Sequence, residues 1–349
     1  MKSDIFSMPW RVWGRPIPAL PEIAVINRIR QAFDKPFPGV LQGIGDDCAV
    51  VRLGKKNYLV TTDVLLEGVH FLPETVPPRR LGRKALAVNL SDIAAMGGRP
   101  LFAFLNLGLP KPVPTKILGS FISGFRQEAD RYGLALLGGD TFYSPERISL
   151  GITVIGEAGD SIPYRSQAKV GDRIFVSGCL GDAAAGLDLL TRAGGVPGGL
   201  LKKYHQQLIA AHQDPVPQIP LGRFLVSGGY ARAMIDLSDG LATDLRHICQ
   251  ASRVGAIIEE EKIPLSKALR AAGPHLNHPL LYFALQGGED YQLLFTSAKG
   301  SVLALQKETL DRFRVRLTEI GEIISGDKIF IRKNGKIQKL KVYGYDHFQ

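Results

Sequence analysis

A chain of 349 residues that is 45% hydrophobic and 22% charged has the composition of an ordinary soluble protein and room for two domains. It contains no apolar run long enough to span a membrane and no signal-peptide core near its start, which argues against a membrane protein. The net charge of +10 comes from scattered Lys and Arg residues without interleaved aromatics, which argues against nucleic acid as the main ligand. The positive charge would serve equally well to attract a phosphorylated metabolite.

The chain begins with residues 1–21, where four prolines and two tryptophans predict an irregular N-terminal extension. Isoleucines at helical spacing then predict a short amphipathic helix over Glu22–Phe33. Two apolar runs, Ala49–Leu53 and Tyr58–Val60, are separated by a polar turn over Gly54–Asn57 and predict a β-hairpin.

Carboxylates stand at both ends of this hairpin, with Asp46 and Asp47 before the first strand and Asp63 after the second. Antiparallel pairing would bring those ends together. Like charges about 4 Å apart repel by roughly 4 kcal/mol at an effective dielectric near 20, so the cluster needs a cation. Thr61 and Thr62 add hydroxyl and carbonyl oxygens, which suit Mg²⁺. Each motif alone is also typical of a turn or a helix N-cap.

Helices and strands alternate along the rest of the chain and predict an α/β organisation. The expected helices are Arg80–Met96, Thr115–Tyr132 and Leu241–Cys249, and the expected strands are Leu101–Leu109, Leu134–Leu137, Ile148–Ile155, Arg173–Val176, Ala233–Leu237 and Gln292–Thr296, before a final hairpin of Lys328–Arg332 and Gln338–Val342. A polar linker over Gly156–Gly171 divides residues 22–156 from a C-terminal α/β domain of residues 157–349.

Further acidic residues stand near the ends of these elements. Asp92 lies near a helix C-terminus, where the macrodipole disfavours an anion, and is either a ligand or a solvated side chain. Asp140 follows two glycines that would let backbone amides approach a phosphate. Asp236 alternates with apolar residues and, if buried, needs a cation or a donor. Asp239 follows it closely, and Ser238 between them is also a natural helix N-cap.

Signatures of other sites are missing. The sequence has no P-loop, no dinucleotide fingerprint and no His or Cys pattern for zinc. Its three cysteines are far apart, which indicates a reducing, cytoplasmic setting. The segment Gly178–Asp182 is either an anion site at a helix N-terminus or a simple strand-to-helix turn. An acid-rich, glycine-flanked α/β frame remains, and it indicates several Mg²⁺ ions, a polyphosphate and phosphoryl transfer.

The order of the motifs resembles that of the thiamine-monophosphate kinase family, which belongs to the aminoimidazole ribonucleotide synthetase-like ATP-binding superfamily. The motifs that carry the resemblance are Gly43–Ala49, Thr61–Phe71, Val88–Gly97, Gly138–Thr141, Ile235–Leu241, Gly287–Tyr291 and Gly344–Phe348. The resemblance covers nearly the whole chain from Glu22 onward, and residues 1–21 have no counterpart in it.

The resemblance implies an α/β (α+β) fold of two domains, in which the sheet of the N-terminal Mg/ATP-binding domain forms an intersubunit barrel in a homodimer. It implies ATP-dependent phosphorylation of thiamine monophosphate to thiamine diphosphate by direct, Mg-assisted transfer, with no residue acting as a covalent nucleophile. ATP would be a co-substrate, several Mg²⁺ ions the cofactors and thiamine monophosphate the acceptor.

The resemblance also assigns site residues by position. The implied Mg²⁺ ligands are Asp47, Thr61, Thr62, Asp63, Asp92, Asp140, Asp236 and Asp239. The implied ATP contacts are Gly139, Asp140, Arg165 and Ser238. The implied thiamine contacts are His70, Glu289 and Tyr345, which could instead be a structural histidine, a surface acid and a packed aromatic. Asp46 stands next to a ligand and is expected to support it.

Two other functions remain open from the sequence. The first is a phosphoribosyl-amidine cyclo-ligase or related ligase of the same superfamily, against which His70-Phe71 and the terminal Tyr-Asp-His-Phe argue. The second is a catalytically idle Mg-nucleotide-binding module with an interaction role through the basic extension. Release of ADP with thiamine monophosphate, compared with other phosphate acceptors, separates all three.

Overall fold

The computed structural model describes residues 11–12, 15–16, 21–33, 35–113, 115–192, 201–298 and 302–341. The chain forms two compact units, one of Met1–Pro38 with Tyr345–Gln349 and one of Gly39–Gly344. In the first unit, β1 (Arg11–Val12) pairs antiparallel with β2 (Arg15–Pro16). Helix α1 spans Glu22–Phe33, as the isoleucine spacing predicts. The predicted tail motif Gly344–Phe348 lies outside the described residues.

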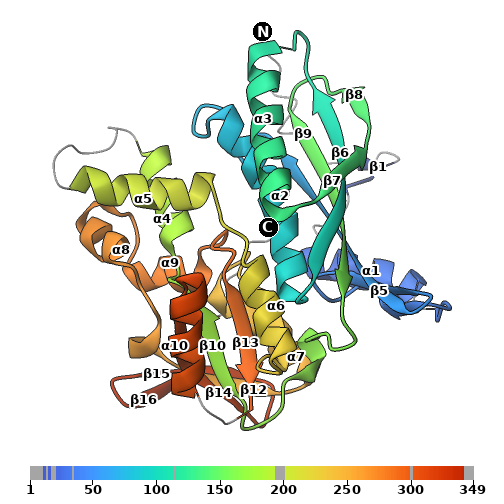
Figure 1. The fold of residues 1–349 in the computed structure, drawn as a ribbon. Helices are drawn as coiled ribbons and strands as arrows, with labels where there is room; N and C mark the ends of the chain where they lie inside the picture. The colour runs from blue at the N-terminus through green and yellow to red at the C-terminus, as the bar shows by residue number, and fades with distance from the viewer. Residues whose placement is uncertain are drawn as a thin grey trace. The chain divides into compact units, whose positions relative to one another are not determined.

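The N-terminal half of the larger unit is a seven-stranded sheet in the order β3-β4-β5-β9-β6-β7, with β8 paired to β6. Its strands are β3 (Val40–Gln42), β4 (Ala49–Leu53), β5 (Lys56–Leu66), β6 (Arg99–Leu109), β7 (Ala135–Gly138), β8 (Thr141–Tyr143) and β9 (Ser149–Ala158). Helix α2 (Pro78–Ala95) packs on β5, β6 and β9, and α3 (Thr115–Tyr132) packs on α2 (Figure 1).

The predicted hairpin forms, with two corrections. Leu53 pairs with Lys56, so the turn consists of Gly54 and Lys55 alone and is shorter than predicted. Strand β5 does not end at Val60 but continues to Leu66, because β9 pairs with it along this whole length. The segment Thr61–Asp63 therefore lies inside a strand rather than after one.

The C-terminal half of the larger unit is a second seven-stranded sheet, in the order β11-β13-β10-β14-β12-β15-β16. Its strands are β10 (Arg173–Ser177), β11 (Ala233–Asp236), β12 (Gly255–Glu259), β13 (Leu293–Ser297), β14 (Leu317–Ile324), β15 (Ile329–Lys333) and β16 (Lys336–Lys339). The pairing is antiparallel except between β12 and β15. The predicted final hairpin forms, with its second strand at Lys336–Lys339 rather than Gln338–Val342, and its turn is Asn334-Gly335, both with positive φ.

Helices surround this second sheet. They are α4 (Asp182–Thr191), α5 (Leu201–Gln213), α6 (Ile219–Ser227), α7 (Leu241–Ser252), α8 (Lys267–Ala272), α9 (Leu280–Gln286) and α10 (Val302–Phe313), with short 3₁₀ turns η2 (Arg165–Gln167), η3 (Glu260–Lys262) and η4 (Gly273–His275). No helix of the described part of the chain is long and apolar enough to cross a membrane.

Helix α2 is the element that connects the two sheets. One continuous apolar core joins Leu86 and Ile93 of this helix to Phe175 and Phe295 of the second sheet. The helix also packs against α6 and β11. Close approach to α6 needs a glycine, because a Cβ at Gly222 would lie 2.1 Å from the carbonyl oxygen of Ala94. Helix α2 therefore lies at the junction of the two halves.

Candidate functional site

Three of the predicted acids meet at this junction. Asp47, Asp92 and Asp236 each offer a carboxylate oxygen within 4.8 Å of the others. They come from the loop before β4, from α2 and from the last position of β11. Asp47 and Asp236 are buried, and within the described residues Asp47 Oδ2 has no hydrogen-bond partner. An all-oxygen group with an unpaired buried carboxylate oxygen fits a hard divalent cation such as Mg²⁺.

The acids are unfavourable neighbours without a counter-charge. Burial, followed by the charge of Asp47, raises the pKa of Asp236 to about 8. Burial raises the pKa of Asp63 to about 6. The pKa of Asp92 is raised well above its usual range by burial and then by the charges of Asp63, Asp236 and Asp47. These shifts show that the fold places negative charges together where water does not screen them.

Strand alternation decides which oxygens of β5 face this group. Thr61 points toward α2, and its hydroxyl donates a hydrogen bond to Asp92 Oδ2. Asp63 lies two residues on and therefore on the same face of the strand. Thr62 lies on the other face, where its hydroxyl is 3.1 Å from the Ile152 carbonyl oxygen and 3.0 Å from the Thr153 hydroxyl. The side chain of Thr62 is thus turned away from the three carboxylates.

Arg165 is the cation that the chain itself brings to this group. Its guanidinium forms an ion pair with Asp47 Oδ1, and its main-chain N–H donates to Asp46 Oδ2 at 3.1 Å. Asp46 Oδ1 also accepts the main-chain N–H of Asp47 at 3.1 Å. Burial, and then the charge of Asp47, raises the pKa of Asp46 to about 7. Asp46 therefore joins the Arg165 segment to the start of β4.

Gly139 and Asp140 lie at a different place in the sheet, outside the group of three acids. A Cβ at Gly139 would come within 1.8 Å of the Leu105 carbonyl oxygen, and its φ is +146°, so this position requires glycine. The main-chain N–H of Asp140 donates to Asn106 Oδ1 at 2.8 Å, and Asp140 Oδ1 accepts the Thr141 N–H at 2.8 Å. Both residues are exposed at the β7–β8 connection.

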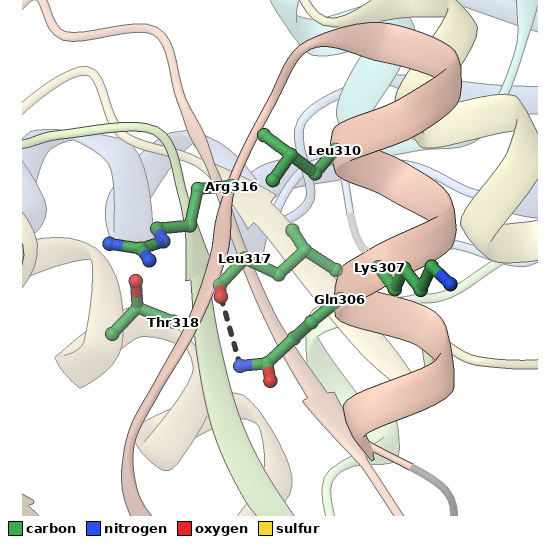
Figure 2. Close-up of a pocket in the computed structure, with 6 residues that line it drawn as sticks. All are labelled: Gln306, Lys307, Leu310, Arg316, Leu317 and Thr318. Atoms are coloured by element: carbon green, nitrogen blue, oxygen red, sulfur yellow. Dashed lines mark hydrogen bonds between the residues drawn. The ribbon is translucent and has the colours of Figure 1, made fainter.

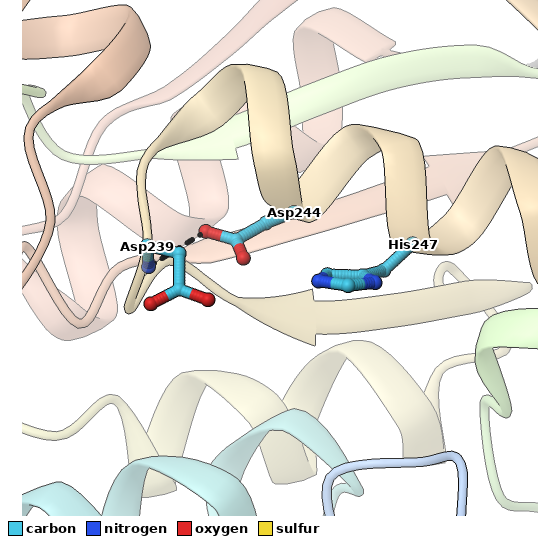
Figure 3. A group of neighbouring side chains, drawn as sticks. All are labelled: Asp239, Asp244 and His247. Carbon is cyan, nitrogen blue, oxygen red and sulfur yellow. Dashed lines mark hydrogen bonds between the residues drawn. The ribbon is translucent and has the colours of Figure 1, made fainter. Parts of the chain in front are cut away.

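A second possible metal-binding group is formed by Asp239, Asp244 and His247, whose ligand atoms lie within 4.8 Å of one another (Figure 3). The Asp239 main-chain N–H donates to Asp244 Oδ2 at 3.2 Å. Burial, and then the charges of Arg165 and Arg246, lower the pKa of His247 to about 4, so the imidazole is neutral near pH 7. Asp244 and His247 were not predicted as site residues, although they stand three residues apart on one face of the predicted helix.

Ser238 is not the N-cap of α7, contrary to that alternative from the sequence. The helix begins at Leu241, and Gly240, with a φ of +100°, takes the N-cap position. The carbonyl oxygen of Ser238 instead accepts the main-chain N–H of Glu289 at 2.8 Å. This bond joins the loop after β11, which carries a predicted ATP contact, to the loop before β13, which carries a predicted substrate contact.

The carboxylate of Glu289 is not a surface acid. Lys84 Nζ lies 2.9 Å from each of its oxygens, and His212 Nδ1 lies 2.8 Å from Oε2. Burial acts to raise the pKa of Glu289, but Lys84 and His212 outweigh it and hold that pKa at about 2. Neither partner was predicted as a site residue; a lysine within a helix, such as Lys84, is ordinarily solvent-exposed.

Of the other two predicted substrate contacts, the structure describes His70. His70 lies in the turn after β5, where its Nδ1 accepts the Leu66 main-chain N–H at 3.0 Å. This bond fixes the ring and supports a structural role for one of its nitrogens. Tyr345 lies outside the described residues.

The segment Gly178–Asp182 is a turn whose helix end is already capped. Asp290 Oδ2 accepts the N–H of Gly181 at 2.6 Å, and Asp290 Oδ1 accepts the N–H of Ala183 at 3.3 Å. A protein carboxylate therefore occupies the N-terminus of α4, which favours the simpler of the two interpretations of this segment.

A hollow on another part of the molecule lies between α10 and β14 (Figure 2). It is lined by Gln306, Lys307, Leu310, Arg316, Leu317 and Thr318. Gln306 Nε2 donates to the Leu317 carbonyl oxygen across it at 3.0 Å. None of the predicted site residues lines this hollow.

The comparisons with known proteins agree with the motifs. The family models of AIR synthase related protein match the chain, the N-terminal domain over residues 45–158 and the C-terminal domain over residues 169–334. Thiamine-monophosphate kinase of Escherichia coli strain K12 is 42% identical over 310 residues, which cover 88% of this chain and 91% of that protein. Thiamine-monophosphate kinase of Aquifex aeolicus strain VF5 is 36% identical over 334 residues, covering 94% and 98%.

A solved structure gives the same result. That of AaThiL complexed with AMPPCP and TMP matches with a TM-score of 0.81 and 35% identity, covering 98% of this chain and 100% of that one. The expected two-domain fold is confirmed by this match and by the two family models. The chain therefore belongs to the AIR synthase related proteins and, within them, to the thiamine-monophosphate kinase family.

Proposed function

We propose that this enzyme transfers the γ-phosphoryl group of ATP to thiamine monophosphate and so forms thiamine diphosphate. The single observation that carries the proposal is the convergence of Asp47, Asp92 and Asp236 beside Arg165, in a chain of this family. Its relatives are named for that activity, and the related AaThiL structure contains AMPPCP, an ATP analogue, together with TMP. ATP is thus the phosphoryl donor.

We propose Mg²⁺ as the cofactor, in several ions. The residues that would hold it are Asp47, Thr61, Thr62, Asp63, Asp92, Asp140, Asp236 and Asp239. Thr62 would act through its main-chain oxygen, because its hydroxyl is bonded to the neighbouring strand. When bound, Mg²⁺ neutralises the charge of the phosphates and withdraws electron density from the transferred group.

For ATP, we propose contacts from Gly139, Asp140, Arg165 and Ser238. Arg165 supports this role because the carboxylates of Asp46 and Asp47 fix both its main chain and its guanidinium. A pre-oriented guanidinium stabilises charge on a transferring phosphoryl group without reorganising during the reaction. Gly139 would allow a phosphate to approach the backbone closely.

Thiamine monophosphate would be held by His70, Glu289 and Tyr345. Its phosphate is the nucleophile and is already anionic at neutral pH, so the chain needs to neutralise charge rather than remove a proton. No residue is proposed as a covalent nucleophile. The buried thiol nearest the acids, that of Cys48, has its pKa raised well above the usual range by burial and by neighbouring carboxylates, so it stays protonated.

We further propose a homodimer formed through residues 22–156, with residues 157–349 as the second domain. Large apolar side chains are exposed on the N-terminal sheet, among them Val64, Phe102, Leu137 and Phe142. Val64 and Phe102 lie on the face of the sheet away from α2, by strand alternation. An apolar sheet face with exposed edge strands suits pairing with a second copy in an intersubunit barrel. The three cysteines are free, which suits the cytoplasm as the compartment.

The proposal is tested by measuring ADP release and identifying the product by mass spectrometry with a panel of phosphate acceptors. We expect thiamine monophosphate to support ADP release and to gain one phosphate. Turnover of a phosphoribosyl amidine with ring closure would instead indicate the ligase alternative. Binding of Mg-ATP with no acceptor turned over would indicate the idle nucleotide-binding module.

A further inference from the structure

The loop that carries Glu289 is held in an unusual backbone conformation. Glu289 and Tyr291 have positive φ angles of 66° and 48°, which non-glycine residues adopt only where the surroundings enforce it. The N–H groups of both residues donate at 2.8 Å to the carbonyl oxygens of Ser238 and Leu237 respectively. The loop therefore fixes where the Glu289 side chain begins.

Two buried side chains fix where that side chain ends. Lys84, from α2, is 1% exposed and places Nζ 2.9 Å from both carboxylate oxygens of Glu289. His212, near the end of α5, is 5% exposed and places Nδ1 2.8 Å from Oε2. Glu289 keeps 25% of its side chain exposed. The carboxylate thus lies against side chains of two helices in the protein interior, and part of the Glu289 side chain remains exposed.

The charge of this carboxylate is already balanced. A buried ammonium group requires a compensating negative charge, and in the described part of the chain Glu289 is the acid that contacts Lys84. The pair is close to neutral, so it offers little attraction to the thiazolium cation. Lone pairs on the accessible side of the carboxylate still accept hydrogen bonds from a neutral N–H donor.

We propose that Lys84 and His212 are positioning residues that hold Glu289 as an oriented hydrogen-bond acceptor for the amino group of the substrate's aminopyrimidine ring. This inference rests on the proposed function. The Lys84–Glu289 pair would then recognise the aminopyrimidine, and other groups would contact the thiazolium.

The position of Lys84 on α2 supports this geometry. Lys84 precedes Asp92 by eight positions on one continuous helix, which is about 12 Å along the axis. An extended thiamine monophosphate spans a comparable length from its phosphate to its pyrimidine. The same helix therefore carries an acid for the phosphate end and a lysine that orients the acceptor for the pyrimidine end.

The first test compares KM values for the two substrates in Lys84→Met and His212→Leu. We expect the KM for thiamine monophosphate to rise by about tenfold to hundredfold, because a hydrogen bond to a charged group is misplaced. The KM for ATP should change by less than about twofold, because Lys84 and His212 touch none of the proposed ATP contacts. His212→Asn keeps a donor near the position of Nδ1 and should restore most of the affinity lost in His212→Leu.

Arg83→Met is the matched control. Arg83 is the neighbour of Lys84 on α2, and its Nε and Nη2 bind the carboxylate of Asp214 at 2.7 and 2.5 Å, just beyond His212. Its loss weakens the same contact between α2 and the end of α5 without touching Glu289. A similar rise in KM in Arg83→Met would overturn the proposal, because it would show that helix docking alone matters.

The second test uses oxythiamine monophosphate, in which an oxo group replaces the amino group. We expect it to be a poorer substrate of the wild-type enzyme and almost insensitive to Lys84→Met, because the bond in question is already absent. Equal loss for both substrates on Lys84→Met would contradict the proposal. If one of Lys84→Met and His212→Leu fails to fold by thermal melting, the other variant, measured with both substrates, decides. Failure of the wild-type enzyme to phosphorylate thiamine monophosphate would instead overturn the proposed function.

Discussion

Asp236 is the residue at which burial and chemistry conflict most strongly. It ends strand β11, is 2% exposed and faces Asp47 across the junction. A carboxylate in such a place destabilises the protein unless a proton or a cation neutralises it. A cation that the reaction requires would also neutralise the Asp236 carboxylate.

We predict that Asp236→Asn lowers turnover on the order of hundredfold or more, the scale seen when one electrostatic contact to a transferring group is removed. The metal-free variant should melt at the same temperature as the wild type or higher at pH 8, because a buried charge has been removed. Steady-state kinetics and a thermal melt check both parts. Near-normal turnover at the same Mg²⁺ concentration would show that Asp236 is structural.

Titration of these acids predicts how stability depends on pH. The folded pKa values of Asp46 and Glu128 are raised to about 7, and those of Asp236 and Asp290 to about 8, in each case first by burial. An acid whose pKa is raised in the folded state binds more protons there than in the unfolded state. Its contribution to stability is therefore lost as pH rises through the folded pKa. His247, with its lowered pKa, opposes this only below about pH 6.5, because above that its imidazole is neutral in both states.

We therefore expect the free energy of unfolding of the metal-free protein to fall between pH 6.5 and pH 8. Mg²⁺ should flatten this dependence, because bound ions replace protons on the carboxylates. Urea titrations at the two pH values, with Mg²⁺ and with a chelator, measure the effect. Stability that rises with pH over this range in the chelator would contradict the buried acid cluster.

At the scale of elements, local signals predicted local structure well. Apolar spacing and a following glycine gave α3 its bounds, with Gly133 at positive φ after Tyr132, and the isoleucines gave α1 its bounds. The length of β5 could not be predicted, because only pairing with β9 extends it to Leu66. Strands β12 and β14 were not predicted, and each pairs with strands that lie far away in the sequence.

Some residues of the candidate site could be predicted from the sequence, and others could not. The acids were visible in the sequence because each follows or interrupts an apolar run. The partners of Glu289 were not visible, because Lys84 and His212 stand 205 and 77 positions away and only the fold brings them together. The Thr62 hydroxyl turns away from Asp92 because side chains alternate along β5. That alternation could be predicted only if β5 were known to continue through Asp63.

Packing of α6 on α2 gives a prediction at this scale. A Cβ at Gly222 would lie 2.1 Å from the Ala94 carbonyl oxygen, so Gly222→Ala should push α6 away and destabilise the protein by about 1–3 kcal/mol. Gly119→Ala on α3 is the control, because nothing lies within 4 Å of its Cβ position. That change should stabilise the protein by roughly 0.5–1 kcal/mol. Shifts of the urea midpoint in the same direction for the two variants would contradict the packing described.

The whole molecule gives a prediction about assembly. One face of the N-terminal sheet carries exposed apolar side chains, and we expect this face to pair with a second copy. Light scattering of the protein at micromolar concentration should give the mass of a dimer. Phe142→Glu, on the exposed strand β8, should shift the mass toward the monomer, and Leu310→Glu, on α10, should not. A monomeric wild-type protein would refute the intersubunit barrel.

The proposed function depends on direct transfer of phosphate to thiamine monophosphate. The most direct measurement supplies ATP labelled with ¹⁸O in its γ-phosphoryl group, together with Mg²⁺ and thiamine monophosphate, and follows the label by mass spectrometry. We expect the labelled phosphoryl group to appear as the terminal phosphate of thiamine diphosphate, with one ADP formed for each thiamine diphosphate. Label that appears only in inorganic phosphate, or ADP formed without thiamine diphosphate, would contradict it.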